Sequence, residues 1–215
     1  MNRREKSHNK DHKGPPAELL KSIVDTFSNG QKNDAIIKIE ELIKAYPLEP
    51  LLFNISGSFH HSDGQLNIAI IRFKQALKLN SNYPEAHYNL GVTLRDLGYT
   101  QEAITSYKNA LSKKNEYPDA HYNLGNAFFS LKKFDSAIKH FESAVFFNPK
   151  HYQAYNNLGL IYKQLGKDLE AGKNFDKALI IKPDYAEATN ERGVISGFCK
   201  IRFDNQCFIK VFTSF

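Results

Sequence analysis

Residues 84–117 read PEAHYNLGVTLRDLGYTQEAITSYKNALSKKNEY, and residues 118–151 follow without a gap as a near-copy, PDAHYNLGNAFFSLKKFDSAIKHFESAVFFNPKH. A third copy occupies residues 152–185, so the period is 34 residues. Self-similarity at such a period is typical of chains that stack one small unit on the next, because a single unit cannot bury its apolar face alone. The sequence therefore predicts a repeat array rather than a globule around one central core.

Each repeat is expected to fold as two helices joined by a short turn. Counted from starts at residues 16, 50, 84, 118 and 152, with a partial sixth repeat from 186, small residues recur at positions 8, 20 and 27 and an aromatic residue at position 24. They are Gly57, Gly91, Gly125, Gly159 and Gly193 at position 8, Ala35, Ala69, Ala103, Ala137 and Ala171 at position 20, Phe73, Tyr107, Phe141 and Phe175 at position 24, and Ala76, Ala110, Ala144 and Ala178 at position 27. Small residues on both helices let the backbones approach closely, and the aromatic ring fills the space beside them.

Another glycine recurs at position 15, where the first helix of each repeat has to end. It is present as Gly30, Gly64, Gly98 and Gly166. A helix commonly ends in a left-handed residue, and glycine adopts that conformation without steric cost. Lys132 takes this place in the fourth repeat, so we expect its turn to close in a different way.

At these positions the chain resembles the tetratricopeptide-repeat family, over about residues 16–195. The resemblance implies an all-α fold, a right-handed superhelical solenoid of antiparallel helix pairs with about five repeats and a partial sixth. Residues 1–15 are then a disordered basic leader, and residues 196–215 an irregular or truncated tail. The first repeat departs from the pattern, with Ile23 at position 8 and Leu42 at position 27, so it should pack less regularly.

Charge and composition restrict the classes of function. The net charge is +6, but residues 1–14 alone carry +3, so half of the excess lies in the leader. This distribution favours a solvated leader, with an anion-contacting arm as the alternative, and nucleic acid is not the expected partner. No apolar run is long enough for a membrane span or a secretion signal, which predicts a cytoplasmic protein. Cys199 and Cys207 match no metal or redox motif, and no cofactor or metal site is expected.

The resemblance also implies that the first helices line a concave groove through positions 2, 5, 6, 9, 12 and 13. Position 6 is asparagine in three successive repeats, as Asn89, Asn123 and Asn157. The other expected groove residues are Tyr88, Tyr122 and Asn156 at position 5, Asn126 at position 9, and Arg95 and Lys163 at position 12. The charged groove positions of repeats 3 to 5 sum to −1, which argues against a channel for a polyanion.

An asparagine side chain can both donate to and accept from the backbone of an extended peptide, whatever the peptide's side chains are. The row therefore suits sequence-tolerant polypeptide binding, and it is similar to the asparagine ladder in the repeat domain of the O-linked N-acetylglucosamine transferases. Alternatively, these amides bond locally or to water.

The sequence thus predicts a non-catalytic protein-protein interaction scaffold that holds an extended segment of another protein. His60 and His61 are adjacent, and we expect His60 to pack while His61 faces solvent or the groove; neither has a recognisable catalytic arrangement. The alternative is the substrate-recruiting arm of a larger bacterial glycosyltransferase, sulfotransferase or iron-dependent oxygenase, without its catalytic domain. Beyond Gly193 the pattern stops, with Arg192 in place of leucine at position 7, so an open end that drives self-association is also considered.

Overall fold

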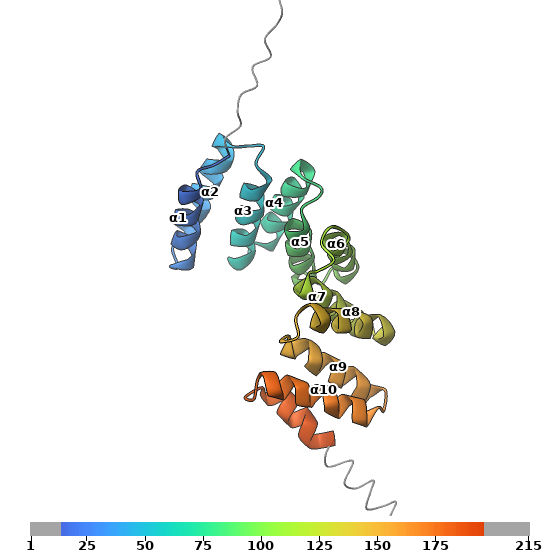
Figure 1. Ribbon diagram of the computed structural model, residues 1–215. Coiled ribbons are helices and arrows are strands. Elements are labelled where there is room, and N and C mark those ends of the chain that lie inside the picture. Colours follow the sequence, from blue (N-terminus) through green and yellow to red (C-terminus); the bar gives the residue numbers. More distant parts are fainter. Residues whose placement is uncertain (1–13, 196–215) are drawn as a thin grey trace, which may run out of the picture. The chain divides into compact units, whose positions relative to one another are not determined.

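The computed structural model describes residues 14–195 (Figure 1). Its helices are α1 (Ala17–Ser28), α2 (Lys32–Ala45), α3 (Pro50–Ser62), α4 (Leu66–Leu79), α5 (Pro84–Asp96), α6 (Thr100–Lys113), α7 (Pro118–Ser130), α8 (Phe134–Phe147), α9 (Tyr152–Gln164) and α10 (Asp168–Ile181). A further helical segment covers residues 186–195. Within the described range no strand occurs, which confirms the predicted all-α class. Most of the leader, the tail from residue 196 and both cysteines lie outside the described residues.

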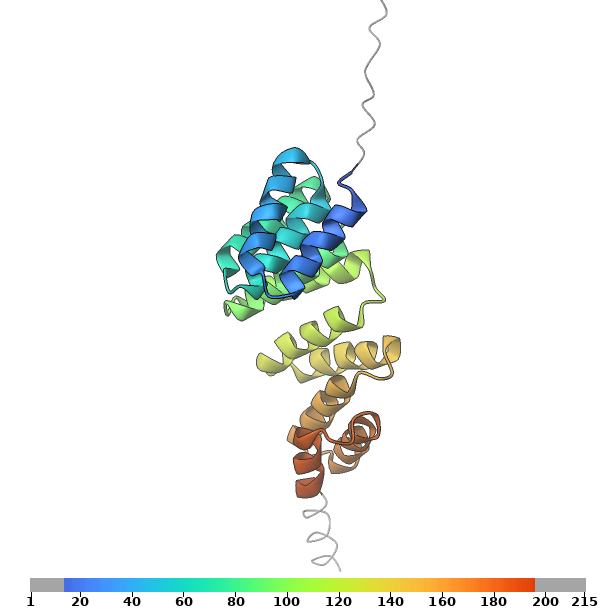
Figure 2. The same cartoon turned by 90° about the vertical axis from the view of Figure 1, so that its left-hand side faces the viewer.

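The chain divides into two compact units, residues 1–93 and 94–215. In the first, α1 packs on α2, α2 on α3 and α3 on α4; in the second, each of α6 to α9 packs on the helix that follows it. Figures 1 and 2 show this succession of neighbouring helices inside each unit. The helices in these pairs thus pack against elements close to them in sequence, as a repeat array requires.

The glycine at position 8 makes room for the aromatic ring at position 24 of the same repeat. A Cβ atom added to Gly125 would lie 2.7 Å from Cε1 of Phe141, and one added to Gly159 would lie 2.6 Å from Cε1 of Phe175. Phe141 and Phe175 are completely buried. The recurring pair of residues is therefore one steric unit, in which the ring occupies the space that a side chain would need.

The first repeat packs as its departures from the pattern predict. Ile23 stands where the other repeats have glycine and is almost completely buried. A branched side chain at this point occupies space that glycine leaves open, and α1 packs on α2 less extensively than α3 packs on α4.

The turn at Lys132 corrects the expectation drawn from the sequence. Gly30, Gly64, Gly98 and Gly166 have φ values of 87°, 78°, 83° and 70°, and Lys132 adopts the same left-handed conformation with φ of 56°. The N–H of Lys132 donates to the carbonyl of Phe129 over 2.9 Å, as the N–H of Gly166 donates to that of Lys163 over 3.0 Å. The expectation of a different closure is wrong, because helix packing and these hydrogen bonds impose one geometry on every turn. A non-glycine residue there costs roughly 1–2 kcal/mol.

Candidate functional site

A pocket of about 170 Å³ opens on the first helices of repeats 2 and 3, inside the first compact unit. It is lined by Ser58, His61 and Ser62 of α3, Phe73 of α4, and Asn89, Val92 and Thr93 of α5. Ser58, His61, Ser62, Asn89 and Val92 occupy positions 6, 9, 12 and 13, which were predicted to face the groove. The expectation for the histidine pair is also confirmed, since His60 is buried and His61 lines the pocket.

Hydrogen bonds around the pocket fix the direction of its polar groups. Nδ2 of Asn89 donates to Oδ1 of Asn54 over 3.0 Å, which leaves Oδ1 of Asn89 as an acceptor. The hydroxyl of Ser58 donates to the backbone carbonyl of Asn54 over 3.0 Å, so its oxygen can only accept from a bound group. Thr93 is completely buried and donates to the carbonyl of Asn89 over 2.8 Å.

In repeats 3 to 5, the asparagine at position 6 is bonded to the repeat before it. In the second compact unit, Nη1 of Arg95 donates to Oδ1 of Asn123 over 3.0 Å, and Nδ2 of Asn157 donates to Oδ1 of Asn126 over 2.7 Å. Asn89 bonds to Asn54 in the same sense within the first unit. These amides therefore link neighbouring first helices. One polar atom of each asparagine side chain is bonded within the array, as in the alternative in which the amides bond locally.

Lys163 has a partner that the sequence did not suggest. Its Nζ lies 2.5 Å from Oε2 of Glu191, at position 6 of the partial sixth repeat. Arg95 and Lys163 therefore make equivalent contacts, since each is a cation at position 12 that bonds to the residue at position 6 of the next repeat. This common spacing is the feature of the sequence from which the contact between Lys163 and Glu191 could have been predicted.

The side chains at position 5 are more buried than is expected of residues that line a groove. Asn156 has no exposed surface, and neither its Nδ2 nor its Oδ1 has a hydrogen-bond partner. Tyr122 lies against the buried Phe141, with ring centroids 5.9 Å apart, and against His151 at 4.5 Å. Asn156 occupies the position that Tyr122 holds one repeat earlier, so the buried amide is not available to a ligand in this structure, and we remove Asn156 from the candidate surface.

Two histidines of the fourth repeat share a hydrogen bond. Nε2 of His121 lies 3.0 Å from the backbone carbonyl of Asn115, so this nitrogen carries a proton and Nδ1 is left to accept. Nδ1 of His140, 3.2 Å away, is then the donor. Burial, His121 and Lys108 lower the pKa of His140 to about 4, and burial also lowers the pKa of His121. The pair is therefore neutral at pH 7.

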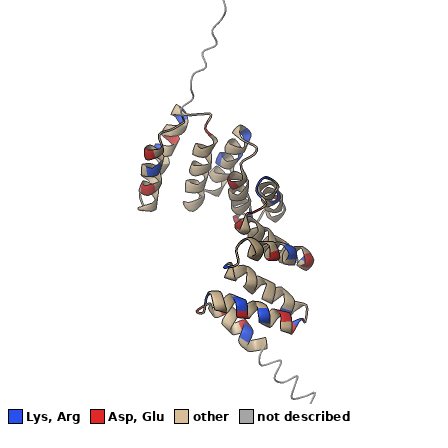
Figure 3. Cartoon of the chain, in the orientation of Figure 1, with Lys and Arg blue, Asp and Glu red and all other residues tan. Residues whose placement is uncertain are grey.

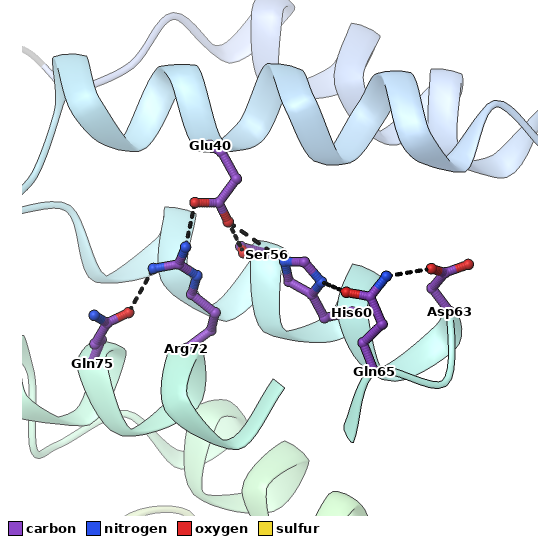
Figure 4. A network of polar contacts seen from close by, with 7 residues as sticks. All are labelled: Glu40, Ser56, His60, Asp63, Gln65, Arg72 and Gln75. Carbon is purple, nitrogen blue, oxygen red and sulfur yellow. Dashed lines mark hydrogen bonds and ion pairs between the residues drawn. The ribbon is translucent and has the colours of Figure 1, made fainter. Parts of the chain in front are cut away.

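A serine, a glutamate and a histidine meet in the first compact unit (Figure 4), but not in a catalytic order. Oγ of the fully buried Ser56 donates to Oε1 of Glu40 over 2.6 Å, and Nε2 of His60 lies 3.6 Å from the same oxygen. The carboxylate lies between the serine and the histidine, so the histidine is not placed to take the hydroxyl proton as it is in a catalytic triad. Arg72 completes the cluster by binding Oε2 of Glu40, and the group joins α2, α3 and α4.

Neither the charges of α10 nor the metal-ligating side chains of residues 14–195 indicate another site. Residues of both signs are interspersed along α10, as Figure 3 shows, instead of forming a basic face. No group of three or more His, Cys, Asp or Glu side chains in this part of the chain could hold a metal ion. None of the described helices has both the length and the hydropathy to cross a membrane.

Several solved structures are similar to this chain. The structure of MamA has 29% identity and a TM-score of 0.70, and the match covers 76% of this chain and 95% of that one. MamA from Desulfovibrio magneticus RS-1 has 18% identity and a TM-score of 0.70, with 78% and 95% covered. YrrB, described as a tetratricopeptide-repeat protein with an unusual peptide-binding site, has 19% identity and a TM-score of 0.68, with 85% and 94% covered. No curated protein matches with significance.

Family models agree with these structural matches. Models described as TPR repeat match residues 57–98 and 93–131, and models described as tetratricopeptide repeat match residues 118–151 and 152–185. Together the matched segments span more than half of the chain. The chain belongs to the tetratricopeptide-repeat family.

Proposed function

We propose that this chain is a non-catalytic cytoplasmic scaffold that binds an extended segment of another protein along the first helices of its repeats. The observation that carries the proposal is the pocket between α3 and α5, most of whose lining residues occupy the positions predicted for the groove. The peptide-binding site in the description of YrrB supports the same kind of ligand.

The hydrogen bonds define what the position 6 residues offer to such a segment. Asn89 and Asn157 each use Nδ2 on a neighbouring repeat, which leaves the amide oxygen to accept from a peptide N–H. Asn123 is only 7% exposed and its oxygen accepts from Arg95, so it contributes mainly by holding adjacent helices. The proposal therefore places binding at repeats 2 and 3, through Asn89, and at repeat 5, through Asn157.

Selection of peptides from a random displayed library tests the proposal. Binders of about micromolar dissociation constant, near −8 kcal/mol, are expected. Asn89→Ala or Asn157→Ala should weaken them by roughly 2- to 10-fold, because one neutral hydrogen bond contributes about 0.5–1.5 kcal/mol. Asn67→Ala is the matched control, since Asn67 is exposed on the second helix α4 and should not affect binding. A library that yields no binder to the folded chain would contradict the proposed function.

A further inference from the structure

The pocket of repeats 2 and 3 contains polar atoms of a definite kind. The hydroxyl of Ser58 donates its only proton to the backbone carbonyl of Asn54. Nδ2 of Asn89 donates to Oδ1 of Asn54. Two oxygens, Oγ of Ser58 and Oδ1 of Asn89, are therefore left as acceptors. A group that brings hydrogen-bond donors into this pocket therefore finds two acceptors for them.

The orientation of the Asn89 amide is set from outside the pocket. Asn54 accepts from Nδ2 of Asn89 and also hydrogen-bonds to Tyr83. The hydroxyl of Tyr83 can donate or accept, so it is compatible with this orientation of Asn54. With Nδ2 of Asn89 held on Asn54, Oδ1 of Asn89 remains an acceptor.

The size and the lining of the pocket further restrict which group can enter it. A volume of about 170 Å³ corresponds to roughly five or six water molecules at about 30 Å³ each. Val92 and the buried ring of Phe73 supply apolar wall, and the exposed Ser62 can turn its hydroxyl either to donate or to accept. A group of a few heavy atoms with an apolar stem and a polar end fits this lining.

The lining favours an uncharged end. No Asp or Glu side chain lines the pocket, so an ammonium group would find no counter-charge there. No Lys or Arg side chain lines it either, although the side chains of His61 and Ser62 can donate a hydrogen bond. Nζ of Lys32 donates to the backbone oxygen of Ser62 over 3.1 Å and lies 4.0 Å from Asp63. A carboxylate would therefore face two acceptor oxygens and lose its hydration without a lysine or arginine to offset that loss.

We infer that this pocket holds the primary carboxamide of an asparagine or glutamine side chain from the bound polypeptide. Its two N–H groups match the oxygens of Ser58 and Asn89, and its carbonyl can accept from Ser62. The inference rests on the proposed function, because it names the side chain that the bound segment places here. A backbone amide shares part of this chemistry but has a single N–H for the two acceptors.

Titration of the whole isotope-labelled chain with small amides tests the pocket directly, by NMR of the Asn89 side-chain amide and the Val92 methyl groups. Propionamide represents the primary carboxamide, N-methylpropionamide the backbone amide and propionate the anion. We expect propionamide to shift both signals with saturation, and the other two to need at least several-fold higher concentration. Ser58→Ala should weaken propionamide by roughly 2- to 10-fold, whereas Asn67→Ala should not change it. Equal responses to propionate or to N-methylpropionamide, or no effect of Ser58→Ala in a folded variant, would overturn the inference.

The peptide selection separates this inference from the proposed function. Binders with an asparagine or glutamine at one fixed position, weakened when that residue becomes aspartate or glutamate, support the inference. Binders without such a position overturn it and leave the scaffold function standing. Failure to select any binder contradicts the proposed function, and the propionamide titration still decides whether the pocket prefers a carboxamide.

Discussion

Replacing Gly125 by alanine would test the contact on which the spacing of the helices depends. The added Cβ would lie 2.7 Å from Cε1 and 2.8 Å from Cδ1 of Phe141, well inside van der Waals contact. The ring is completely buried, so it cannot turn into solvent to make room. Overpacking of this kind costs typically about 1–3 kcal/mol.

Helix propensity acts in the opposite direction and has to be separated from the steric term. Alanine is favoured over glycine in a helix interior by about 1 kcal/mol. Gly172→Ala is a matched control, because Gly172 is buried inside α10 of the same compact unit and its added Cβ would meet Arg192 at an ordinary 3.6 Å. We expect this control to gain about 1 kcal/mol and Gly125→Ala to lie about 1–3 kcal/mol below it.

Urea unfolding followed by circular dichroism measures both variants, with hydrogen exchange to locate the change because repeat arrays can unfold in parts. A second substitution, Phe141→Leu, should recover part of the loss in the Gly125→Ala background, since it removes the ring that the Cβ strikes. If Gly125→Ala gained as much stability as Gly172→Ala, the glycine would not be there to accommodate the ring, and the account of the repeat core would be wrong.

Three further predictions concern the turns, the histidine pair and the polar cluster. Gly166→Ala should lose roughly 1 kcal/mol of unfolding free energy from backbone strain alone, because its added Cβ would meet nothing within 4 Å. Lys132→Gly should gain up to about 1 kcal/mol by relieving the same strain. The urea midpoints of the two variants should therefore move in opposite directions. Since the pKa of His140 is lowered to about 4 from 6.5, the unfolded chain binds more protons between these values, so stability is complete above pH 6.5 and falls as the pH drops toward 4. The loss should be about 1–2 kcal/mol after solvent screening of this partly exposed ring, and unfolding of His140→Phe should lack that pH dependence. Glu40→Ala should lower the free energy of unfolding by about 2–3 kcal/mol, because it leaves Arg72 and Ser56 without their shared partner. Lys32→Ala, which removes the exposed pair with Asp63, should show less than half that effect in thermal melts.

The architecture of this chain is readable from its sequence because the determining contacts are short-range and repeated. Gly125 and Phe141 stand in one repeat, 16 residues apart, and the same offset recurs at Gly57 and Gly159. A recurring offset reveals a packing rule even when each single residue would be ambiguous. Residue type does not predict the turn at Lys132, because the surrounding helices impose a left-handed conformation on a lysine there.

The groove positions could be proposed from the sequence, but their hydrogen bonds could not. Asn89 and His61, at two of these positions, line one pocket. That Asn157 is bonded to Asn126, or Arg95 to Asn123, depends on how far one side chain reaches across two helices. Such contacts join residues about 30 positions apart, and the pattern of residue types leaves their rotamers open.

Leucine is missing from position 7 at Ser22, Ser56 and Arg192, and the last two of these share a compensating contact. Ser56 replaces the leucine in repeat 2 and bonds to Glu40, and Arg192 replaces it in the partial sixth repeat and bonds to Asp176 over 2.6 Å. Both acids stand at position 25 of the preceding repeat. A polar side chain between repeats is tolerated where a charged partner faces it, because its hydrogen-bonding groups are then satisfied. The helical segment of residues 186–195 accordingly stays docked, with Ala188 and Ile195 buried, although the sequence pattern ends at Gly193. Loss of the leucine therefore changes the chemistry of the last repeat contact without ending the array there.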